Sequence, residues 1–370
     1  MRILHVVGAR PNFVKCAPVM RALSTHRGIH QALVHTGQHY DANMSQVFFD
    51  QLRLPGPDIR LDTGGEGAPQ SELTRALAPI VSMRRPDWVV VYGDVDSTVA
   101  AARVAAEQGV RIAHVEAGLR SFDRTMPEEL NRIATDRLAS LHFTPSRDAG
   151  EHLRREGIRA SGVKWVGNVM IDTLRCLQDR VTTPPLPCLA TEYALLTMHR
   201  PSNVDSYESA KRLLELLDIL LERLQVVFPI HPRTRRRLET FGLSLPRHER
   251  FCSLEPQGYL QFLALEKHAA VVLTDSGGVQ EETTALGVPC LTLRENTERP
   301  VTVAQGTNRL VGQDRALLRE SLATILAGHW KRGVVPELWD GNAAKRIAGC
   351  FFDLLKGKGA TVPEPLRQRG

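Results

Sequence analysis

The sequence lacks any apolar run that approaches the roughly 18–20 residues needed for a membrane-spanning helix. Its first residues, 1–11, contain Arg2 and reach a Gly-Ala-Arg-Pro turn where a secretory signal would need a longer apolar stretch and a cleavage site. We therefore expect a first buried strand, a cytoplasmic protein and no membrane insertion.

Cysteines and aromatic residues are also scarce. The six cysteines are scattered without a Cys-x-x-Cys pair, which argues against a zinc site or disulfides and favours buried, reduced cysteines. Only 5% of residues are aromatic, and no basic stripe alternates with aromatics, so a nucleic-acid partner is not expected despite the net charge of +6. The chain has no P-loop, GxGxxG or HExxH motif, so we expect no cofactor and no metal.

What the sequence contains is an alternation of short, β-branched apolar runs with longer amphipathic stretches, which is typical of βαβ units and parallel sheets. With 370 residues the chain is long enough for two domains. The prolines within residues 181–191 suit neither a helix nor a central strand. We predict an α/β fold of two Rossmann-like domains, residues 1–182 and 190–355, and a flexible tail at 356–370. The expected strands are 3–7, 33–36, 88–92, 112–116, 141–144, 193–197, 226–230, 270–274 and 290–293, and the clearest expected helices are 14–24, 97–108, 211–224 and 278–286.

Polar residues follow several of the expected strands in the first half. Arg10 and Lys15 flank the helix start after the first strand, where free N–H groups and two cations would suit a diphosphate. An ion pair is the alternative for Arg10. Asp94 and Glu116 each end a strand, where we see little structural reason for a carboxylate. Carboxylates that converge on one site divide into acid and base roles, and from spacing alone both a catalytic and a structural interpretation remain open.

Two adjacent glutamates, Glu128 and Glu129, lie at a further helix start in MPEELNR (residues 126–132). A carboxylate there can be catalytic or can simply interact with the helix dipole. Periodicity does not decide which of the two is functional.

The second half has its strongest local signal in TDSGGVQEET (residues 274–283). Ser276 can meet phosphate or sugar oxygens, Gly277 and Gly278 let the backbone approach a ligand, and a carboxylate in the next helical turns can bind ribose hydroxyls. The alternative is a plain glycine-rich turn with a capping serine. His199 follows another strand and is a candidate for a phosphate or acid–base role. His231 opens a basic run that can face phosphate or start a solvated helix.

In fixed order along nearly the whole chain, these segments resemble the non-hydrolysing UDP-N-acetylglucosamine 2-epimerases. The matching segments are GARPNFVK, HTGQHYD, YGDVDST, HVEAGLR, MPEELNR, VGNVMIDT, MHRPSN, TDSGGVQEET and LRENTERP. The resemblance implies a GT-B-like architecture with the active site in the interdomain cleft, no NAD or metal, a UDP-sugar substrate and a homodimer. It also implies reversible conversion of UDP-GlcNAc to UDP-ManNAc through elimination of UDP to a 2-acetamidoglucal and re-addition.

Carried over by motif, the resemblance assigns roles to individual residues. It implies proton transfer by Asp94, Glu116 and Glu128, with His199 as the catalytic histidine next to the diphosphate. It favours Glu128 over Glu129. The implied binding residues are Arg10 and Lys15 for phosphates, Ser276 and Glu282 for phosphate and ribose, and Phe262 against uracil.

The sequence departs from the family pattern at two motifs. Asn12 ends Arg-Pro-Asn where many members have Arg-Pro-Glu, and Pro201 and Ser202 fall within the histidine motif. In addition, Tyr40 and Asp41 follow Gln38-His39. We therefore do not expect activation by a second substrate molecule in the form known for many bacterial members. Four alternatives stay open: an epimerase of another UDP-2-acetamido sugar such as a 2,3-diacetamido uronic acid, a hydrolysing 2-epimerase, a GT-B glycosyltransferase, and a catalytically silent nucleotide-sugar sensor.

Overall fold

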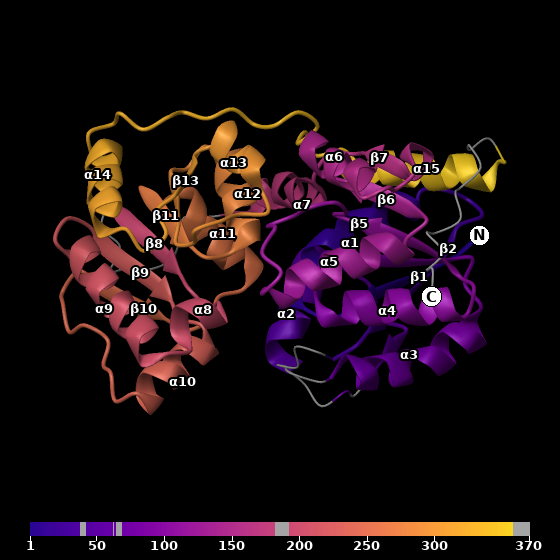
Figure 1. The fold of residues 1–370 in the computed structure, drawn as a ribbon, viewed down its shortest axis with the longest axis horizontal. Helices are drawn as coiled ribbons and strands as arrows, with labels where there is room; N and C mark the ends of the chain where they lie inside the picture. The colour runs from indigo at the N-terminus through magenta and orange to yellow at the C-terminus, as the bar shows by residue number, and fades with distance from the viewer. Residues whose placement is uncertain (38–41, 62, 64–68, 182–191, 358–370) are drawn as a thin grey trace. The chain divides into compact units, whose positions relative to one another are not determined.

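The computed structural model describes residues 1–37, 42–61, 63, 69–181 and 192–357 (Figure 1). Contacts divide the chain into two compact units. The first unit comprises residues 1–176 together with the chain from residue 337 onward, and the second comprises residues 177–336. Each unit is built on one parallel sheet, which confirms the predicted α/β class.

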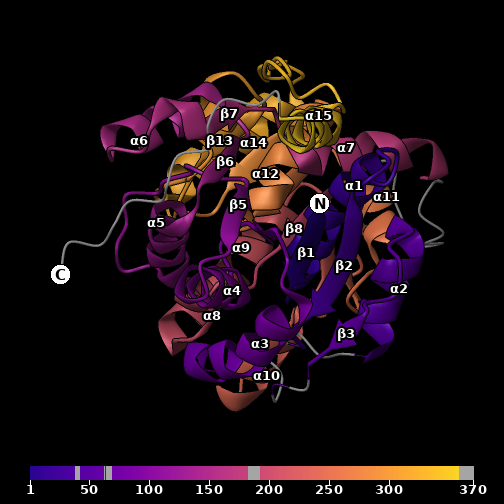
Figure 2. The same cartoon turned by 90° about the vertical axis from the view of Figure 1, so that its right-hand side faces the viewer.

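The sheet of the first unit has the strand order β3-β2-β1-β4-β5-β6-β7. Its strands are β1 (Arg2–Val7), β2 (His30–His35), β3 (Ile59–Arg60), β4 (Trp88–Tyr92), β5 (Arg111–Val115), β6 (Leu141–Thr144) and β7 (Val163–Trp165). Its helices are α1 (Arg10–Leu23), α2 (Ala42–Leu52), α3 (Gln70–Arg84), α4 (Asp96–Glu107), α5 (Pro127–Leu138), α6 (Arg147–Arg155), α7 (Val169–Leu177) and α15 (Ala343–Leu355). Figure 2 shows α3, α4 and α5 on one side of the central strands and α1 and α15 on the other. Because both faces are covered, strand β4 is buried along its whole length and is almost entirely apolar.

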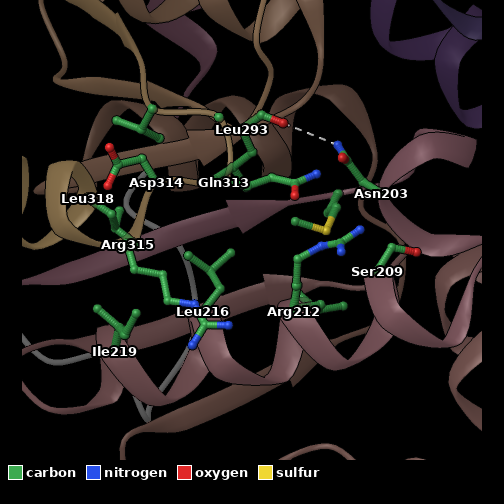
Figure 3. A pocket seen from close by; sticks show the side chains of 14 residues that line it. Asn203, Ser209, Arg212, Leu216, Ile219, Leu293, Gln313, Asp314, Arg315 and Leu318 are labelled. Atoms are coloured by element: carbon green, nitrogen blue, oxygen red, sulfur yellow. Dashed lines mark hydrogen bonds between the residues drawn. The ribbon is translucent and has the colours of Figure 1, made fainter.

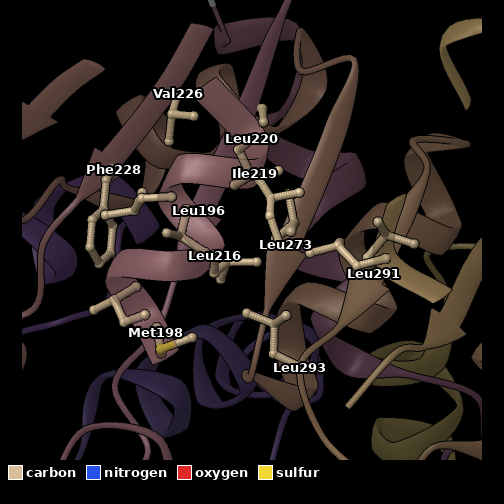
Figure 4. Close-up of a cluster of buried hydrophobic side chains, with 14 of the residues drawn as sticks. Leu196, Met198, Leu216, Ile219, Leu220, Val226, Phe228, Leu273, Leu291 and Leu293 are labelled. Atoms are coloured by element: carbon tan, nitrogen blue, oxygen red, sulfur yellow. The ribbon is translucent and has the colours of Figure 1, made fainter. Parts of the chain in front are cut away.

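The sheet of the second unit has the order β10-β9-β8-β11-β12-β13. Its strands are β8 (Tyr193–Thr197), β9 (Gln225–Pro229), β10 (Phe251–Leu254), β11 (Val271–Thr274), β12 (Cys290–Thr292) and β13 (Asn308–Leu310). Its helices are α8 (Pro201–Val204), α9 (Tyr207–Leu221), α10 (Pro232–Thr240), α11 (Tyr259–Lys267), α12 (Gly277–Leu286), α13 (Pro300–Ala304) and α14 (Arg315–Leu326). Leu196 of β8 and Leu273 of β11 form a core cluster together with Leu216 and Leu220 of α9 (Figure 4).

The strand order determines where each sheet can bind a ligand. In the first sheet the order reverses between β1 and β4, and in the second it reverses between β8 and β11. Open parallel sheets bind ligands beyond the carboxyl ends of the strands at such a switch point. The candidate ligand-binding segments are therefore those that follow β1, β4 and β5 in the first sheet and those that follow β8 and β11 in the second.

The nine expected strands are all present, within three residues at each end. Four further strands, β3, β7, β10 and β13, were not predicted. All four are the outermost strands of their sheets, and none is longer than four residues. An outer strand is paired on one side only and is partly exposed, so it lacks the continuous apolar run by which a central strand is recognised.

The last helix belongs to the first unit, although its place in the sequence predicts the second domain, residues 190–355. Its Phe351 is fully buried, with ring centroids 5.5 Å from Trp88 and 5.9 Å from Phe143. The sequence does not predict this contact, because the two parts of the chain lie far apart in it. Most of the expected linker (182–191) and tail (358–370), and the residues Gln38 to Asp41, lie outside the described residues.

The structure bears on the expectations about membrane-spanning helices and about the cysteines. Within the described ranges, no helix is long and apolar enough to cross a membrane. Cys16 and Cys290 are buried, as expected, but Cys176 is exposed, so that expectation was wrong there. The five described cysteines are all free, and Cys188 lies outside the described residues.

Candidate active site

The turn after β1 is fixed to the end of β4 by Asn12, a residue given no role in the sequence analysis. Its side-chain oxygen accepts hydrogen bonds from the backbone N–H groups of Gly8 at 3.0 Å and Ala9 at 3.1 Å. Its side-chain nitrogen donates to the carbonyl of Tyr92 at 2.8 Å. Helix α1 begins at Arg10, which is half-buried. Asn12 thus holds the start of this helix at the switch point of the first sheet.

Lys15 lies in the second turn of α1 and forms a buried ion pair with Glu116. The lysine Nζ is 2.5 Å from the glutamate Oε2, and the side chains are 6% and 2% exposed. Glu116 has a left-handed backbone with φ of 71°, and its N–H donates to the carbonyl of Phe143 at 3.1 Å. The residue predicted to contact phosphate and a residue predicted to transfer protons are therefore direct partners in this structure.

Asp94, which follows β4, is held by a buried arginine on α5. Arg132 places its Nε 3.0 Å and its Nη2 2.8 Å from Asp94 Oδ2. Its other terminal nitrogen, Nη1, donates to Glu129 Oε2 at 2.7 Å. The premise that a carboxylate at these strand ends has little structural reason was therefore wrong, because both Asp94 and Glu116 have a cationic partner.

The two adjacent glutamates of α5 have different surroundings. Glu129 is buried and accepts hydrogen bonds from the Ser121 N–H at 2.9 Å, the Ser121 hydroxyl at 3.0 Å and the Phe122 N–H at 3.1 Å. Glu128 is half-buried, and its carboxylate has no hydrogen-bond or ion-pair partner among the described residues. Glu129 therefore supports the preceding loop, whereas the carboxylate of Glu128 remains available for another role.

A second buried network lies behind these strand ends and centres on Asp136. The ring nitrogen Nδ1 of His114 is 2.7 Å from Asp136 Oδ1, and Arg120 Nη2 is 2.7 Å from Asp136 Oδ2. Burial alone would raise the pKa of Asp136, but His114 and Arg120 hold it well below its usual range. The other ring nitrogen of His114 is 2.8 Å from the carbonyl of Gly93, so the network reaches the residue next to Asp94.

In the second unit, His199 follows β8 and is oriented by Asp275, which follows β11. The His199 Nδ1 lies 3.0 Å from Asp275 Oδ1. Asp275 is fully buried and also accepts the backbone N–H groups of His199 at 3.0 Å and Arg200 at 2.9 Å. Although burial would raise the pKa of Asp275, His199 and these donors hold it well below its usual range. Because Nδ1 is engaged, the second ring nitrogen of this half-exposed histidine is the one that can act on a ligand.

His231 lies beside His199, with ring centroids 5.6 Å apart. Its Nδ1 accepts the N–H of Arg233 at 3.2 Å and so caps α10. Arg233 and Arg237 of the same basic run bind Asp205 at 2.5 Å and 3.1 Å. Ion pairs therefore neutralise most of the run, and its first residue, His231, lies next to His199.

The turn before α12 differs from a plain serine-capped turn. Ser276 is the N-cap residue, but its side chain does not cap the helix, and its hydroxyl has no hydrogen-bond partner among the described residues. A Cβ added at Gly277 would lie 2.1 Å from Arg299 Nη1. Glycine is thus required at 277 because an arginine side chain occupies that space. Gly278 is the second residue of α12 and is half-buried.

Arg299 belongs to a cluster of buried arginine and glutamate side chains that the sequence analysis did not assign. Its Nε lies 2.9 Å from Glu281 Oε1, and its Nη1 lies 2.5 Å from Glu298 Oε1. Arg294 binds the other oxygen of Glu298 at 2.8 Å. The cluster accounts for Glu281 and leaves Glu282 as the carboxylate available for another role.

Glu282 is buried on α12 and accepts a hydrogen bond from the Tyr259 hydroxyl at 2.7 Å. Burial raises the pKa of Glu282, and burial together with the nearby charge of Glu282 raises that of Glu266 on α11. Phe262 also lies on α11 and is half-buried against the apolar cluster that contains Leu265 and Val279. Glu282 and Phe262 thus come from helices that pack together, as a ribose contact and a base contact would require.

A cavity of about 60 Å³ in the second unit lies beside α9 and α14 (Figure 3). Two of its polar side chains already have partners: Asn203 donates to the carbonyl of Leu293 at 3.3 Å, and Asp314 accepts the N–H groups of Ala316 and Leu317. None of the predicted site residues lines it. Among the described residues, no group of His, Cys, Asp and Glu could hold a metal ion.

Comparison with known proteins gives consistent matches over nearly the whole chain. The sequence model of the family described as UDP-N-acetylglucosamine 2-epimerase matches residues 21–351. The chain is 40% identical over 360 residues to the UDP-N-acetylglucosamine 2-epimerase of Methanocaldococcus jannaschii, covering 94% of this chain and 98% of that protein. It is also 40% identical over 331 residues to the UDP-2,3-diacetamido-2,3-dideoxy-D-glucuronate 2-epimerase of Pseudomonas aeruginosa, covering 88% of this chain and 92% of that protein.

A solved structure agrees with these sequence matches. The crystal structure of Methanocaldococcus jannaschii UDP-GlcNAc 2-epimerase in complex with UDP-GlcNAc and UDP is similar to this structure, with a TM-score of 0.86 at 39% sequence identity. The match covers 95% of this chain and 99% of that chain.

Proposed function

Because this chain belongs to the UDP-N-acetylglucosamine 2-epimerase family, we propose that it interconverts UDP-GlcNAc and UDP-ManNAc by inversion at carbon 2. The observation that carries the proposal is the set of side chains beyond β1, β4 and β5 of the first sheet. Lys15, Asp94 and Glu116 follow these three neighbouring strands, and Glu128 lies on α5, one turn before the arginine that holds Asp94.

In the proposed reaction, the substrate loses UDP across the bond between carbons 1 and 2 and forms a 2-acetamidoglucal. The hydrogen on carbon 2 is not next to a carbonyl group, so its removal as an enolate-forming proton is not available. One carboxylate takes the proton as the diphosphate leaves, and another group returns a proton to the opposite face before UDP adds back. Asp94, Glu116 and Glu128 are the proposed proton-transfer groups, and Arg132 is a positioning residue for Asp94.

The second unit is proposed to hold the UDP. His199, oriented by Asp275, would bind the diphosphate and stabilise its charge as it departs. Ser276, with its unused hydroxyl at the start of α12, would meet phosphate oxygens, together with Gly277 and Gly278. Glu282 would accept the ribose hydroxyls and Phe262 would pack against uracil, while Arg10, Lys15 and His231 would contact phosphates. Lys15 would divide its interaction between the diphosphate and Glu116.

A second candidate substrate is a UDP-2,3-diacetamido uronic acid. The relative named for that substrate is as similar to this chain, at 40% identity, as the relative named for UDP-GlcNAc. The reaction at carbon 2 would be the same, and only the substituents at carbons 3 and 6 of the sugar would differ.

Incubation with each UDP-sugar in deuterium oxide, without an acceptor, tests the proposal. We expect UDP-ManNAc with deuterium at carbon 2 from UDP-GlcNAc, measured by NMR and mass spectrometry. Exchange with the diacetamido uronic acid alone would transfer the proposal to that substrate. Free ManNAc and UDP would indicate the hydrolysing reaction, and absence of exchange from both sugars would contradict an epimerase.

Substitution of the carboxylates separates catalysis from binding. We expect Asp94→Asn and Glu116→Gln each to abolish turnover and to leave UDP binding, measured by calorimetry, mostly intact. Full turnover in both variants would contradict the carboxylate assignment. The homodimer implied by the family remains a prediction, which light scattering of the purified chain can test.

A further inference from the structure

The turn that carries Asp94 depends on hydrogen bonds from other elements for its shape. Gly93, which precedes Asp94, has a left-handed backbone with φ of 63°, and a Cβ at this position would lie 2.8 Å from Lys15 Nζ. A glycine has no side chain to restrict its rotation. The direction of the peptide between Gly93 and Asp94 is therefore set by the groups that bind it.

Both backbone groups of Gly93 bind residues of strand β5. Its N–H donates to the carbonyl of Val115 at 3.0 Å, and its carbonyl lies 2.8 Å from Nε2 of His114. A carbonyl oxygen can only accept a hydrogen bond, so His114 carries a hydrogen on Nε2 and donates it to Gly93. Because the peptide unit is planar, the direction of this carbonyl also fixes the plane that contains the Asp94 Cα. His114 thus acts on the backbone from which the Asp94 side chain projects.

The ring of His114 is itself held in one orientation by helix α5. Its Nδ1 lies 2.7 Å from Asp136 Oδ1, and both residues are fully buried. The other oxygen of Asp136 is 2.7 Å from Arg120 Nη2 and accepts the N–H of Gly118 at 3.2 Å, and these donors favour the ionised carboxylate. A flip of the imidazole ring would place carbon atoms against both the carboxylate and the Gly93 carbonyl. The two acceptors together therefore select the observed orientation.

Helix α5 also holds Asp94 directly, at two further points. Asn131 donates to the Asp94 carbonyl at 3.0 Å, and Arg132 binds the Asp94 carboxylate at 2.8 Å. Asp136 follows Arg132 by four residues, about one helical turn. The helix thus reaches the side chain of Asp94, the carbonyl after it and, through Asp136 and His114, the peptide before it.

We propose that His114 is a positioning residue for Asp94, acting through its hydrogen bond to the Gly93 carbonyl. The proposal rests on the proposed function, in which Asp94 transfers a proton at carbon 2 of the sugar. A small displacement of a reacting group removes much of its catalytic effect. Groups of the second unit, which are proposed to bind UDP, are not affected by such a displacement. Loss of His114 should therefore lower turnover and leave UDP binding in place.

A single labelled peptide reports on this hydrogen bond, because Gly93 and Asp94 form the only Gly-Asp pair in the sequence. Protein made with carbonyl-¹³C glycine and amide-¹⁵N aspartate should give one signal in an HNCO spectrum, from the Gly93 carbonyl and the Asp94 N–H. We expect the carbonyl signal to move upfield in His114→Asn, because the shorter side chain does not reach Gly93. His114→Gln places an amide near the position of Nε2 and should keep the signal close to that of the parent protein.

The same variants separate positioning from folding. We expect His114→Asn to lower kcat for deuterium exchange at carbon 2 by about 10²-fold, with KM and UDP binding little changed, and His114→Gln to recover most of this loss. His142→Asn is the matched control. His142 is paired with His114 on the neighbouring strand β6, and its ring binds the carbonyls of Asp136 and Gly162. The control should lower the melting temperature and leave kcat and the Gly93 signal unchanged.

Equal losses of kcat in His114→Asn and His142→Asn, or an unmoved Gly93 signal in His114→Asn, would overturn the proposal. If His114→Asn does not fold, the parent protein still tests the hydrogen bond. With ring-¹⁵N histidine and carbonyl-¹³C glycine, we expect a through-bond correlation between the Nε2–H of His114 and the Gly93 carbonyl, and its absence would overturn the proposal. Absence of exchange in the parent protein would contradict both the epimerase and a catalytic role of His114. The NMR signals do not depend on turnover, so the two failures are distinguishable.

Discussion

Lys15 and Glu116 neutralise each other inside the first unit, with the lysine Nζ 2.5 Å from the glutamate Oε2. The pair joins the second turn of α1 to the residue that follows β5. Burying either charge alone is costly, whereas the pair is tolerated because each ion replaces part of the other's lost hydration. A substrate diphosphate that draws on Lys15 would therefore also change the electrostatic environment of Glu116, the proposed proton-transfer group.

Removal of one partner of this pair should destabilise the protein strongly. We expect Lys15→Met to lower the free energy of unfolding by about 3–5 kcal/mol, because the buried carboxylate of Glu116 loses its lysine partner. The double variant with Glu116→Gln should recover part of that loss. Urea unfolding followed by tryptophan fluorescence measures both. The exposed pair of Arg147 and Glu337 is the control: Glu337→Gln should cost roughly 0–1 kcal/mol, and an equally small loss in Lys15→Met would contradict the account.

The adjacent glutamates of α5 should respond in opposite ways to the same substitution. Glu128→Gln is expected to reduce turnover by about 10²–10⁴-fold, as loss of a general acid or base does, with little change in melting temperature. Glu129→Gln is expected to lower the melting temperature, because its carboxylate binds Ser121, Phe122 and Arg132. Deuterium exchange at carbon 2 and calorimetric melting make the comparison. If the Glu129→Gln variant kept its stability and lost only turnover, the two roles would be reversed.

Much of the fold could be predicted because each central strand carries its own apolar signal. Strands β4, β6 and β8 begin and end where their runs of apolar residues predict. The outer strands carry no such signal, since partners on one side only leave them short and partly exposed. The place of α15 was missed for another reason: its apolar face shows that it packs, but nothing in its sequence shows that Phe351 packs on Trp88, more than 250 residues earlier.

The candidate site likewise contains residues that the local sequence indicates and partners that it does not. Ser276 and the pair of Glu128 and Glu129 could be selected because each follows a strand or starts a helix, which is visible locally. Only the family resemblance favoured Glu128 over Glu129. The partners that hold the site could not be selected in this way. Arg132 binds Asp94 across 38 residues, and Asp275 binds His199 across 76. A charged residue inside a helix pattern is usually a solvated one, so pairings across such distances require the tertiary structure.

A glycine-to-alanine pair tests the close approach at the start of α12. We expect Gly277→Ala to displace Arg299, since the new Cβ would lie 2.1 Å from its Nη1, and so to disturb its ion pairs with Glu281 and Glu298. Breaking such buried pairs should lower the free energy of unfolding by about 3 kcal/mol or more and weaken UDP binding. Gly349→Ala on α15 is the control, because nothing lies within 4 Å of its added Cβ. That variant should be neutral or slightly stabilising in urea unfolding, and an equal loss in both would exclude the steric explanation.

The buried carboxylate of Asp136 should make stability fall in acid. Burial opposes its charge, but His114 and Arg120 hold its pKa well below the unfolded value of about 3.9. A group whose pKa is lower in the folded protein contributes stability that is fully present above the unfolded pKa and is lost as pH falls through the folded one. The free energy of unfolding should therefore decrease steadily below about pH 4. At neutral pH, Asp136→Asn should lower the free energy of unfolding by about 3–5 kcal/mol, because the buried Arg120 loses one of its carboxylate partners. In acid, the free energy of unfolding of the variant should approach that of the parent protein.

The matched control for this pH dependence is Asp340, whose pKa is lowered to about 2 chiefly by a hydrogen bond from Arg346 at the surface. Solvent screening makes such a surface pair weak, so Asp340→Asn should change the pH profile little. The measurement is urea unfolding of the three proteins between pH 2 and pH 8, with the slope of stability against pH giving the difference in bound protons. A parallel profile for parent protein and Asp136→Asn would show that Asp136 titrates alike in the folded and unfolded chains, and the buried network would then carry no acid sensitivity.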